Sequence, residues 1–226
     1  LPDVVLAPLA DRPLIDYTLE AALQIDAFDV VLVSTDDQRV ADYAERYHPR
    51  VIGRVRPEGL SGQHTGEEIV LHHALLHLAE ERGIAADTIV SLAVNCPLRR
   101  SEHVQEALDT LALFETDMVI SVYEDYGLHF VHDALGMRPL NPGMHLQVRL
   151  EREALYVWNG AVRALRRDSL GQDEFRAESV GHVVMRSEES FQIKTEFDLR
   201  LIEELIQSSL VPGSIGHENL AAPLPD

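Results

Sequence analysis

Short apolar runs alternate with helix-patterned stretches along most of this chain, and this alternation constrains its fold more than any other feature. The runs at 30–33, 88–92 and 118–122 have the length and composition of buried strands. Between them, residues 65–81 and 101–114 carry apolar side chains at helical spacing. Strands joined through helices pair in parallel, so the sequence predicts an α/β fold with a doubly wound, mostly parallel sheet.

The alternation stops between Glu124 and Tyr156, where prolines, glycines and scattered aromatics replace any sustained period. A long irregular segment inside a compact fold usually serves function or an oligomer contact. We therefore predict one domain over residues 1–209 with an insertion at 124–156. The Pro-rich stretch at 210–226 is predicted to be a tail or linker.

Charge and cysteine content narrow the classes of partner. The formal net charge of −19 argues against nucleic acid and anionic membranes, because both would be repelled. One cysteine excludes an internal disulfide. No stretch has the pattern of a membrane span or a signal peptide, so a cytoplasmic location is expected. The chain starts without Met, and we expect further residues upstream.

The turn after the apolar run at 88–92 carries Asn95, Arg99 and Arg100. The run itself predicts a strand buried on both faces. Ligands of open parallel sheets bind outside the carboxyl ends of the strands. The turn is therefore predicted to hold these side chains on an anion-facing rim, and the alternative is an ordinary loop with solvated arginines.

Two stretches earlier in the chain also carry polar residues directly after a predicted strand. Ser34-Thr35-Asp36-Asp37 follows an apolar strand, where it could face a ligand, cap the next helix, or do both. Arg56 precedes the helix whose expected start is marked by Thr65 and Glu68, spaced as in a capping box. A guanidinium and a helix N-terminus could together surround a phosphate.

Two further groups have a functional and a structural interpretation. His73 and His77 are spaced as helix-borne metal ligands can be, but no partner cluster stands out, and a polar or half-buried helix face is the favoured interpretation. Tyr156 and the pair Asn159-Gly160 lie close in sequence to Arg149. Asn-Gly usually marks a turn, whereas here its apolar flanks favour a strand lining a pocket.

Taken together, these pieces resemble the nucleotidyltransferases that activate acidic sugars with CTP, most of all the acylneuraminate (CMP-sialic acid) cytidylyltransferase family. The resemblance spans about residues 1–207. It rests on short matches in the family's order: Pro8–Ile15 beside PLAGKPLI, Val33–Asp37, Arg56-Pro57, Leu92–Arg99 beside LQPTSPLR, Arg149, Asn159–Ala161, and Thr195–Leu199 beside DIDTEEDL.

The resemblance implies a Rossmann-like fold and transfer of CMP from CTP to an acidic acceptor, with release of pyrophosphate. It implies a homodimer in which segment 124–156 completes the partner's pocket. Ala93 replaces a glutamine that contacts the sugar acid in the family, so the acceptor is expected to be a nonulosonic or other sugar acid, or a phosphonate. The implied nucleotide-binding residues are Ser34, Asp36 and Arg56, and the implied acceptor-side residues are Asn95, Arg99, Arg149, Tyr156, Asn159 and Gly160.

Departures from the family pattern concern the metal and the phosphates. The two aspartates of DIDTEEDL are Gln192 and Lys194 here. Mg²⁺ prefers carboxylate oxygens, which Lys194 cannot supply, although its ammonium could stabilise phosphate charge in place of the ion. Asp198 is the remaining candidate ligand, but with Thr195 it also has the pattern of a capping box.

These losses leave a second hypothesis open. Val4 and Val5 also stand where the family has polar contacts to the nucleotide. The chain could therefore be a catalytically degenerate homologue, acting as a binding, regulatory or dimerisation module.

Overall fold

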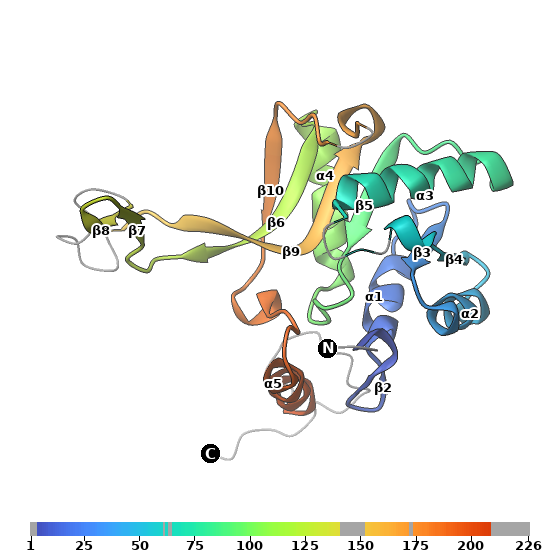
Figure 1. Ribbon diagram of the computed structural model, residues 1–226, viewed down its shortest axis with the longest axis horizontal. Helices are drawn as coiled ribbons and strands as arrows, with labels where there is room; N and C mark the ends of the chain where they lie inside the picture. Colours follow the sequence, from blue (N-terminus) through green and yellow to red (C-terminus); the bar gives the residue numbers. More distant parts are fainter. Residues whose placement is uncertain (1–3, 61, 63–64, 141–151, 172–173, 209–226) are drawn as a thin grey trace, which may run out of the picture.

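The computed structural model describes residues 4–60, 62, 65–140, 152–171 and 174–208, which form a layered α/β body with one projecting arm (Figure 1). The helices are α1 Leu14–Leu23, α2 Gln38–Tyr47, α3 Glu67–Arg82, α4 Ser101–Leu113 and α5 Glu196–Gln207. The strands are β1 Pro8–Leu9, β2 Arg12–Pro13, β3 Val31–Thr35, β4 Val51–Val55, β5 Thr88–Leu92, β6 Met118–Asp125, β7 Phe130–Asp133, β8 Gly136–Pro139, β9 Leu155–Arg166 and β10 Val180–Val184. Short 3₁₀ turns include η1 Val4–Leu6, η2 Glu58–Leu60, η5 Arg167–Ser169 and η6 Glu188–Ser190.

The largest sheet has the strand order β10-β6-β9-β5. β6 and β10 pair in parallel, whereas β9 is antiparallel to both β5 and β6. β5, β6 and β10 therefore run in one direction and β9 alone runs against them. β3 and β4 form a separate parallel pair. The predicted mostly parallel α/β fold is confirmed.

Helices cover both faces of the main sheet, because its strands carry apolar side chains on both faces in alternation. On one face Val104 and Leu111 of α4 pack with Val119, Ala164 and other buried residues. On the opposite face α3 packs over Ile89 and Leu165. At about 25 cal/mol for each Å² of buried apolar surface, these two layers supply most of the stabilisation that holds the sheet.

β5 departs from the prediction that it is buried on both faces. Among the described residues it pairs with β9 alone and lies at an end of the sheet. Ile89 is buried, while the next three residues of the strand are only half-buried. An apolar run therefore identified the strand correctly but not its place in the sheet.

The segment at 124–156, predicted as an irregular insertion, contains a β-hairpin. β6 and β9 continue beyond the body as a pair, with Glu124 opposite Tyr156. The β7–β8 hairpin extends the arm further (Figure 1). Residues 141–151, which include the predicted acceptor residue Arg149, lie outside the described part of the chain, as does the predicted tail from residue 210.

Of two helix starts predicted from the sequence, the structure confirms one and contradicts the other. Asp37 caps α2, accepting a hydrogen bond from the backbone N–H of Arg39 at 2.8 Å. The capping box predicted for Thr65 and Glu68 is wrong, because α3 begins after Gly66 and that position carries no side-chain cap. No described helix is long and apolar enough to span a bilayer.

Candidate active site

The carboxyl ends of β3 and β4 bring Ser34 and Arg56 together, as their predicted shared role requires. Ser34 is the cross-strand partner of Arg54, and Arg56 follows directly after β4. The backbone N–H of Arg56 donates to the carbonyl of Thr35 at 2.6 Å, and its Nη1 donates to the carbonyl of Ser34 at 3.4 Å. Asp36 is exposed just beyond β3.

Polar atoms at this place are buried but have no hydrogen-bond partner. They are Ser34 Oγ, Arg54 Nε, Arg56 Nε and His73 Nδ1, and we call this group the β3–β4 edge. Side chains 54 and 56 lie on one face of the strand because they are two residues apart. α3 lies against that face, since its Glu81 pairs with Arg54 Nη2 at 3.3 Å. A buried donor without an acceptor costs free energy, so this group is suited to receive an anion.

The histidines of α3 belong to this packed face. Glu81 also accepts from His77 Nδ1 at 3.1 Å, and His77 is buried. Burial lowers the pKa of His73, and the nearby charge of Arg54 lowers it further. In the residues that the structure describes, no three His, Cys, Asp or Glu side chains are grouped to hold a metal ion. The half-buried helix face is thus the better of the two interpretations.

The turn after β5 is built differently from the predicted rim. Arg99 is only 3% exposed, and its Nη1 donates to the carbonyls of Ala93 and Ala161, both at 3.0 Å. Burial lowers the pKa of this guanidinium to about 10. Its predicted position on an exposed rim is therefore wrong, because the turn folds back and uses the arginine to join β5 to β9. Asn95 remains half-buried, and its carbonyl accepts from the N–H of Ile193 at 2.8 Å.

Asn159 is 2% exposed and lies at the centre of a hydrogen-bond network. Its Oδ1 accepts from Ser121 Oγ at 2.5 Å and from the N–H of Ala161 at 3.1 Å. Its Nδ2 donates to Ser190 Oγ at 2.9 Å. Residues 93–99 and 159–161, which this network and Arg99 join, are called the β5–β9 edge. The side chain predicted to bind an acceptor is instead occupied by the protein.

Gly160 follows with a φ of +72°, a left-handed conformation that favours glycine. A Cβ at this position would lie 3.3 Å from Nε2 of Gln192, which donates to the carbonyl of Asn159. The Asn-Gly pair is therefore part of a long strand with a left-handed residue at Gly160, so the strand is confirmed, and its place beside a pocket stays a prediction.

Tyr156 lies further out on β9, where it is 55% exposed and stacks on His182 with ring centroids 4.9 Å apart. It stands where β9 leaves the body for the arm, well along the strand from Asn159. Arg152 Nη1 donates to the carbonyl of Tyr126 at 3.3 Å, which ties the base of the arm together.

The segment that joins β10 to α5 carries Gln192, Lys194 and Asp198. Asp198 Oδ2 accepts from the N–H groups of Lys194 and Thr195, at 2.9 and 2.7 Å, and also from Thr195 Oγ1 at 3.0 Å. These bonds form the predicted capping box and lower the pKa of Asp198. An amide, an ammonium and an engaged carboxylate do not fit the oxygen ligands that Mg²⁺ requires from a protein.

Three polar residues that organise this region have no recognisable motif in the sequence. Ser121, Glu189 and Ser190 are all buried, and each contacts a residue at least 30 positions away in the chain. Only a pattern of apolar flanks around single polar residues could have drawn attention to them.

Comparisons with known proteins agree with this architecture. A family model described as "Cytidylyltransferase" matches residues 1–211. The chain is 26% identical to a CMP-N,N'-diacetyllegionaminic acid synthase of Legionella pneumophila, over 88% of this chain and 87% of that protein. It is 24% identical to post-translational flagellin modification protein B of Campylobacter coli, over 87% and 85%. A solved CMP:2-keto-3-deoxy-manno-octonic acid synthetase, complexed with CTP, superposes with a TM-score of 0.66 at 16% identity, covering 92% of this chain and 93% of that one.

Proposed function

The chain belongs to the cytidylyltransferase family, and we propose that it transfers CMP from CTP to a sugar acid, such as a nonulosonic acid, and releases pyrophosphate. The legionaminic acid synthase, which resembles it over almost its full length, supports this class of acceptor. The same likeness favours an enzyme over a degenerate binding module.

The observation that carries the proposal is the set of unpartnered donors at the β3–β4 edge. In a chain of net charge −19, an anion can be held only where cations are concentrated and desolvated. Arg54 and Arg56 place two guanidinium groups, each with a buried Nε, next to Ser34, and His73 lies beside them with a lowered pKa that favours its neutral form. The triphosphate of CTP supplies the acceptor oxygens that these buried groups lack.

The chemistry needs positioning and charge stabilisation more than covalent participation of the protein. A hydroxyl oxygen of the acceptor forms a bond to the α-phosphorus of CTP while the bond from that phosphorus to the bridging oxygen breaks. The proton leaves the attacking hydroxyl, and the negative charge passes to pyrophosphate. Asp36, at the end of β3, is proposed to lie near the nucleotide.

Lys194 is proposed to stabilise the charge of the phosphates where other family members use carboxylates and a metal. It lies close to the β5 turn, because the neighbouring N–H of Ile193 donates to the carbonyl of Asn95. Its positive charge also opposes the burial that raises the pKa of the Cys96 thiol to about 11.

On the acceptor side, Asn95, Gly160 and Tyr156 are the proposed contacts, and Arg149, which lies outside the described residues, is proposed as a further one from the resemblance of its sequence context. Asn159 and Arg99 are proposed to act indirectly, by holding the two strand ends at a fixed separation. This division follows from burial, since both side chains are almost fully inaccessible.

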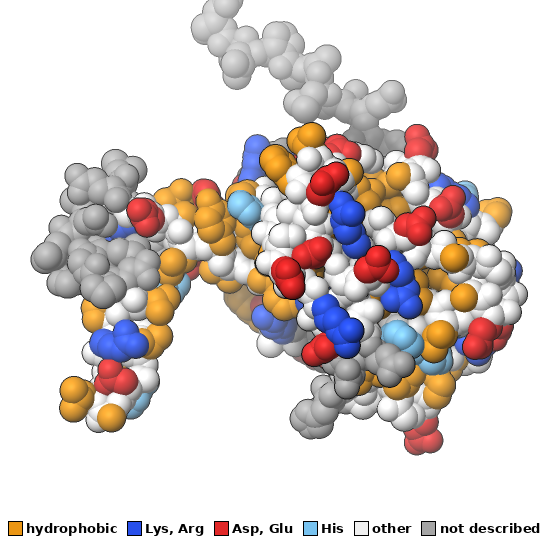
Figure 2. All heavy atoms as spheres, turned by 90° about the horizontal axis from the view of Figure 1, so that it is seen from above, with side chains coloured by type: hydrophobic (Ala, Val, Ile, Leu, Met, Phe, Trp, Pro, Cys, Tyr) orange, Lys and Arg blue, Asp and Glu red, His pale blue; other side chains and the backbone are white. Residues whose placement is uncertain are grey.

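We also propose that the arm is a contact between two copies of the chain. It exposes large apolar side chains along its length (Figure 2): Leu128, Phe130, Leu135, Met137, Leu140, Tyr156 and Trp158. A monomer rarely leaves so many together in water. Light scattering should give twice the monomer mass of 25.3 kDa, and a monomer at micromolar concentration would contradict this part of the proposal.

The proposed function is tested first by thermal shift with CTP, using UTP and ATP as controls, each with and without Mg²⁺. A ligand at a hundred times its dissociation constant stabilises by about 2.7 kcal/mol. A selective shift with CTP is expected, followed by pyrophosphate release when N-acetylneuraminic, legionaminic or 2-keto-3-deoxy-octonic acid is added. No shift with any nucleotide would support the binding-module hypothesis instead.

A further inference from the structure

Residues 186–195, here called the connecting segment, lead from β10 to α5 and carry Gln192 and Lys194. We propose that Glu189 is a positioning residue for the transfer reaction, its buried carboxylate fixing the connecting segment so that Lys194 meets the phosphates of the nucleotide. The inference rests on the proposed function, and it concerns a residue that no motif in the sequence marks.

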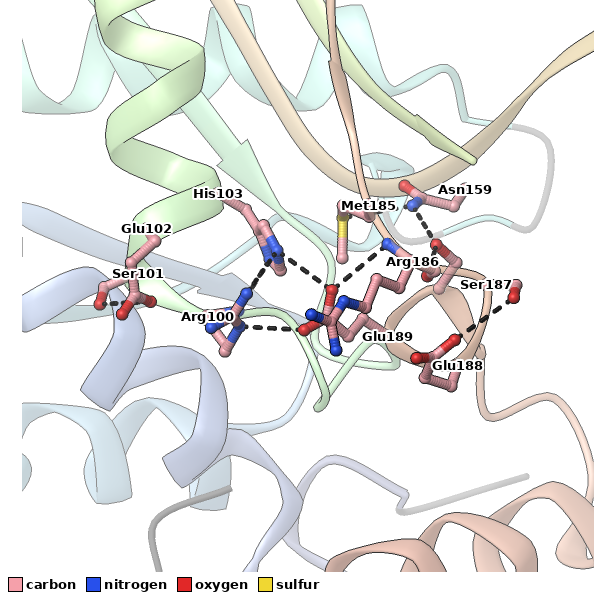
Figure 3. Close-up of polar contacts among 11 residues, drawn as sticks. Arg100, Ser101, Glu102, His103, Asn159, Met185, Arg186, Ser187, Glu188 and Glu189 are labelled. Carbon is pink, nitrogen blue, oxygen red and sulfur yellow. Dashed lines mark hydrogen bonds and ion pairs between the residues drawn. The ribbon is translucent and has the colours of Figure 1, made fainter. Parts of the chain in front are cut away.

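Glu189 joins the connecting segment to the first turn of α4 (Figure 3). The carboxylate is 1% exposed, which excludes direct contact with a substrate. Its Oε1 lies 3.1 Å from Arg100 Nε, and its Oε2 lies 3.3 Å from His103 Nε2. Oε2 also accepts from the N–H of Arg186 at 3.3 Å, so the carboxylate fixes its own segment as well as the helix.

The protonation of this cluster follows from its hydrogen bonds. His103 Nδ1 accepts from the backbone N–H of Arg100 at 3.2 Å, so the ring proton is on Nε2 and points to Glu189. Burial lowers the pKa of His103, which keeps the ring neutral. One carboxylate and one guanidinium therefore balance, and the histidine adds a hydrogen bond without adding a charge.

A short path leads from Glu189 to Lys194. The next residue, Ser190, accepts from Asn159 and donates to the carbonyl of Arg186 at 2.9 Å. Three residues further, the N–H of Ile193 donates to the carbonyl of Asn95, and Ile193 is buried. Hydrogen bonds at Ser190 and Ile193 thus fasten the connecting segment to the β5–β9 edge. Lys194 follows immediately, with an exposed side chain whose backbone has little freedom.

The charge of a buried carboxylate is better suited to this task than an apolar contact. A buried charge that loses its partner is strongly destabilised, so Glu189 tolerates only the arrangement in which Arg100 and His103 both reach it. An apolar side chain would allow the segment to slide, because dispersion contacts are not directional. The carboxylate therefore specifies one position for the segment.

The test is a double-mutant cycle on the full chain, measured by pyrophosphate release from CTP. The variants are Glu189→Gln, Lys194→Ala and both together, with Glu188→Gln as the matched control, since Glu188 is adjacent and only bonds to Ser187. Lys194→Ala should lower kcat on the order of 100-fold, and Glu189→Gln roughly tenfold, because the ammonium remains but is misplaced. The double variant should be no slower than Lys194→Ala alone.

Multiplying effects in the double variant, or an equal loss in Glu188→Gln, would overturn the inference. Hydrogen exchange without substrate gives a readout independent of catalysis. The N–H groups of residues 193–195 should exchange faster in Glu189→Gln and at the parent rate in Glu188→Gln; unchanged exchange in Glu189→Gln also overturns it. A parent protein that neither binds CTP nor releases pyrophosphate refutes the proposed function instead, and exchange alone then decides whether Glu189 positions the segment.

Discussion

The two edges of the proposed site satisfy their polar groups in opposite ways. At the β5–β9 edge the amide of Asn159 is fully engaged by protein atoms, and Arg99 joins two carbonyls of different strands. At the β3–β4 edge, buried atoms of Ser34, Arg56 and His73 have no partner. The β5–β9 edge is held mainly by the protein's own hydrogen bonds, although Nε and Nη2 of Arg99 are also buried without a partner, whereas the β3–β4 edge presents two guanidinium groups that the protein engages only in part. Substitutions at the first should therefore alter stability, and substitutions at the second should alter binding.

The largest effect is expected for Asn159→Ala. The change leaves Ser121 and Ser190 without their shared partner in the core, which should cost about 2–4 kcal/mol of unfolding free energy. Denaturant unfolding measures the loss. Ser34→Ala is the comparison at the other edge, and its unfolding free energy should stay the same or rise slightly because an unsatisfied hydroxyl is removed. Equal destabilisation of the two variants would end the distinction between the edges.

Arg56→Ala addresses binding directly. Loss of a charged, desolvated donor should weaken CTP binding by about 1.5–3 kcal/mol, or roughly 10- to 100-fold in dissociation constant, with unfolding nearly unchanged. Titration calorimetry gives the affinity. Arg82→Ala, at the exposed end of α3, removes the same charge away from the site and serves as the control. A similar loss of affinity there would mean that only overall charge matters.

Arg99→Met tests the comparison at the β5–β9 edge. The carbonyls of Ala93 and Ala161 lose their donor, but the cost of burying a guanidinium disappears as well. We expect a destabilisation of about 1–2 kcal/mol, smaller than for Asn159→Ala. CTP affinity should not change, and a loss of affinity equal to that of Arg56→Ala would place Arg99 at the nucleotide after all.

The smallest effect concerns pH. Because burial lowers the folded-state pKa of His103 below its ordinary value of 6.5, the folded protein binds fewer protons than the unfolded chain just below that pH. Stability contributed by the neutral ring is complete above pH 6.5 and should decline as the pH falls below it. Thermal melts from pH 7.5 to 5 test this, and His103→Gln should show a flatter dependence. An identical slope in the variant would show that other groups dominate.

Regular elements were predictable because periodicity is a local property of sequence. The apolar runs that became β3, β5 and β6, and the helical patterns of α3 and α4, were each visible without knowledge of the fold. The residue identities at the strand ends also located the candidate site, since Ser34, Asn95 and Gly160 do lie at the carboxyl ends or bends of strands in the structure.

Burial of individual polar side chains was not predictable in the same way. Arg99 was expected in solvent, because nothing near it in sequence announces two carbonyls from separate strands. Glu189 was missed for a related reason: its partners are on α4, far back in the chain. The start of α3 was wrong because a favourable spacing of Thr65 and Glu68 does not determine where the backbone turns. The errors at Arg99 and Glu189 thus involve contacts between distant parts of the chain, whereas the error at α3 is local.

One consequence of β9 concerns how the chain can change over evolution. The same strand forms part of the core and extends into the arm, and Tyr156 lies where one portion passes into the other. Side chains alternate faces along a strand, so inserting or deleting a single residue between Gly160 and Arg166 would reverse which side chains point inward. A change of length in the arm, before Leu155, leaves the facing of every β9 side chain in the body unchanged. Relatives should therefore tolerate arms of many lengths, while the core portion of β9 admits substitutions but no shift of register.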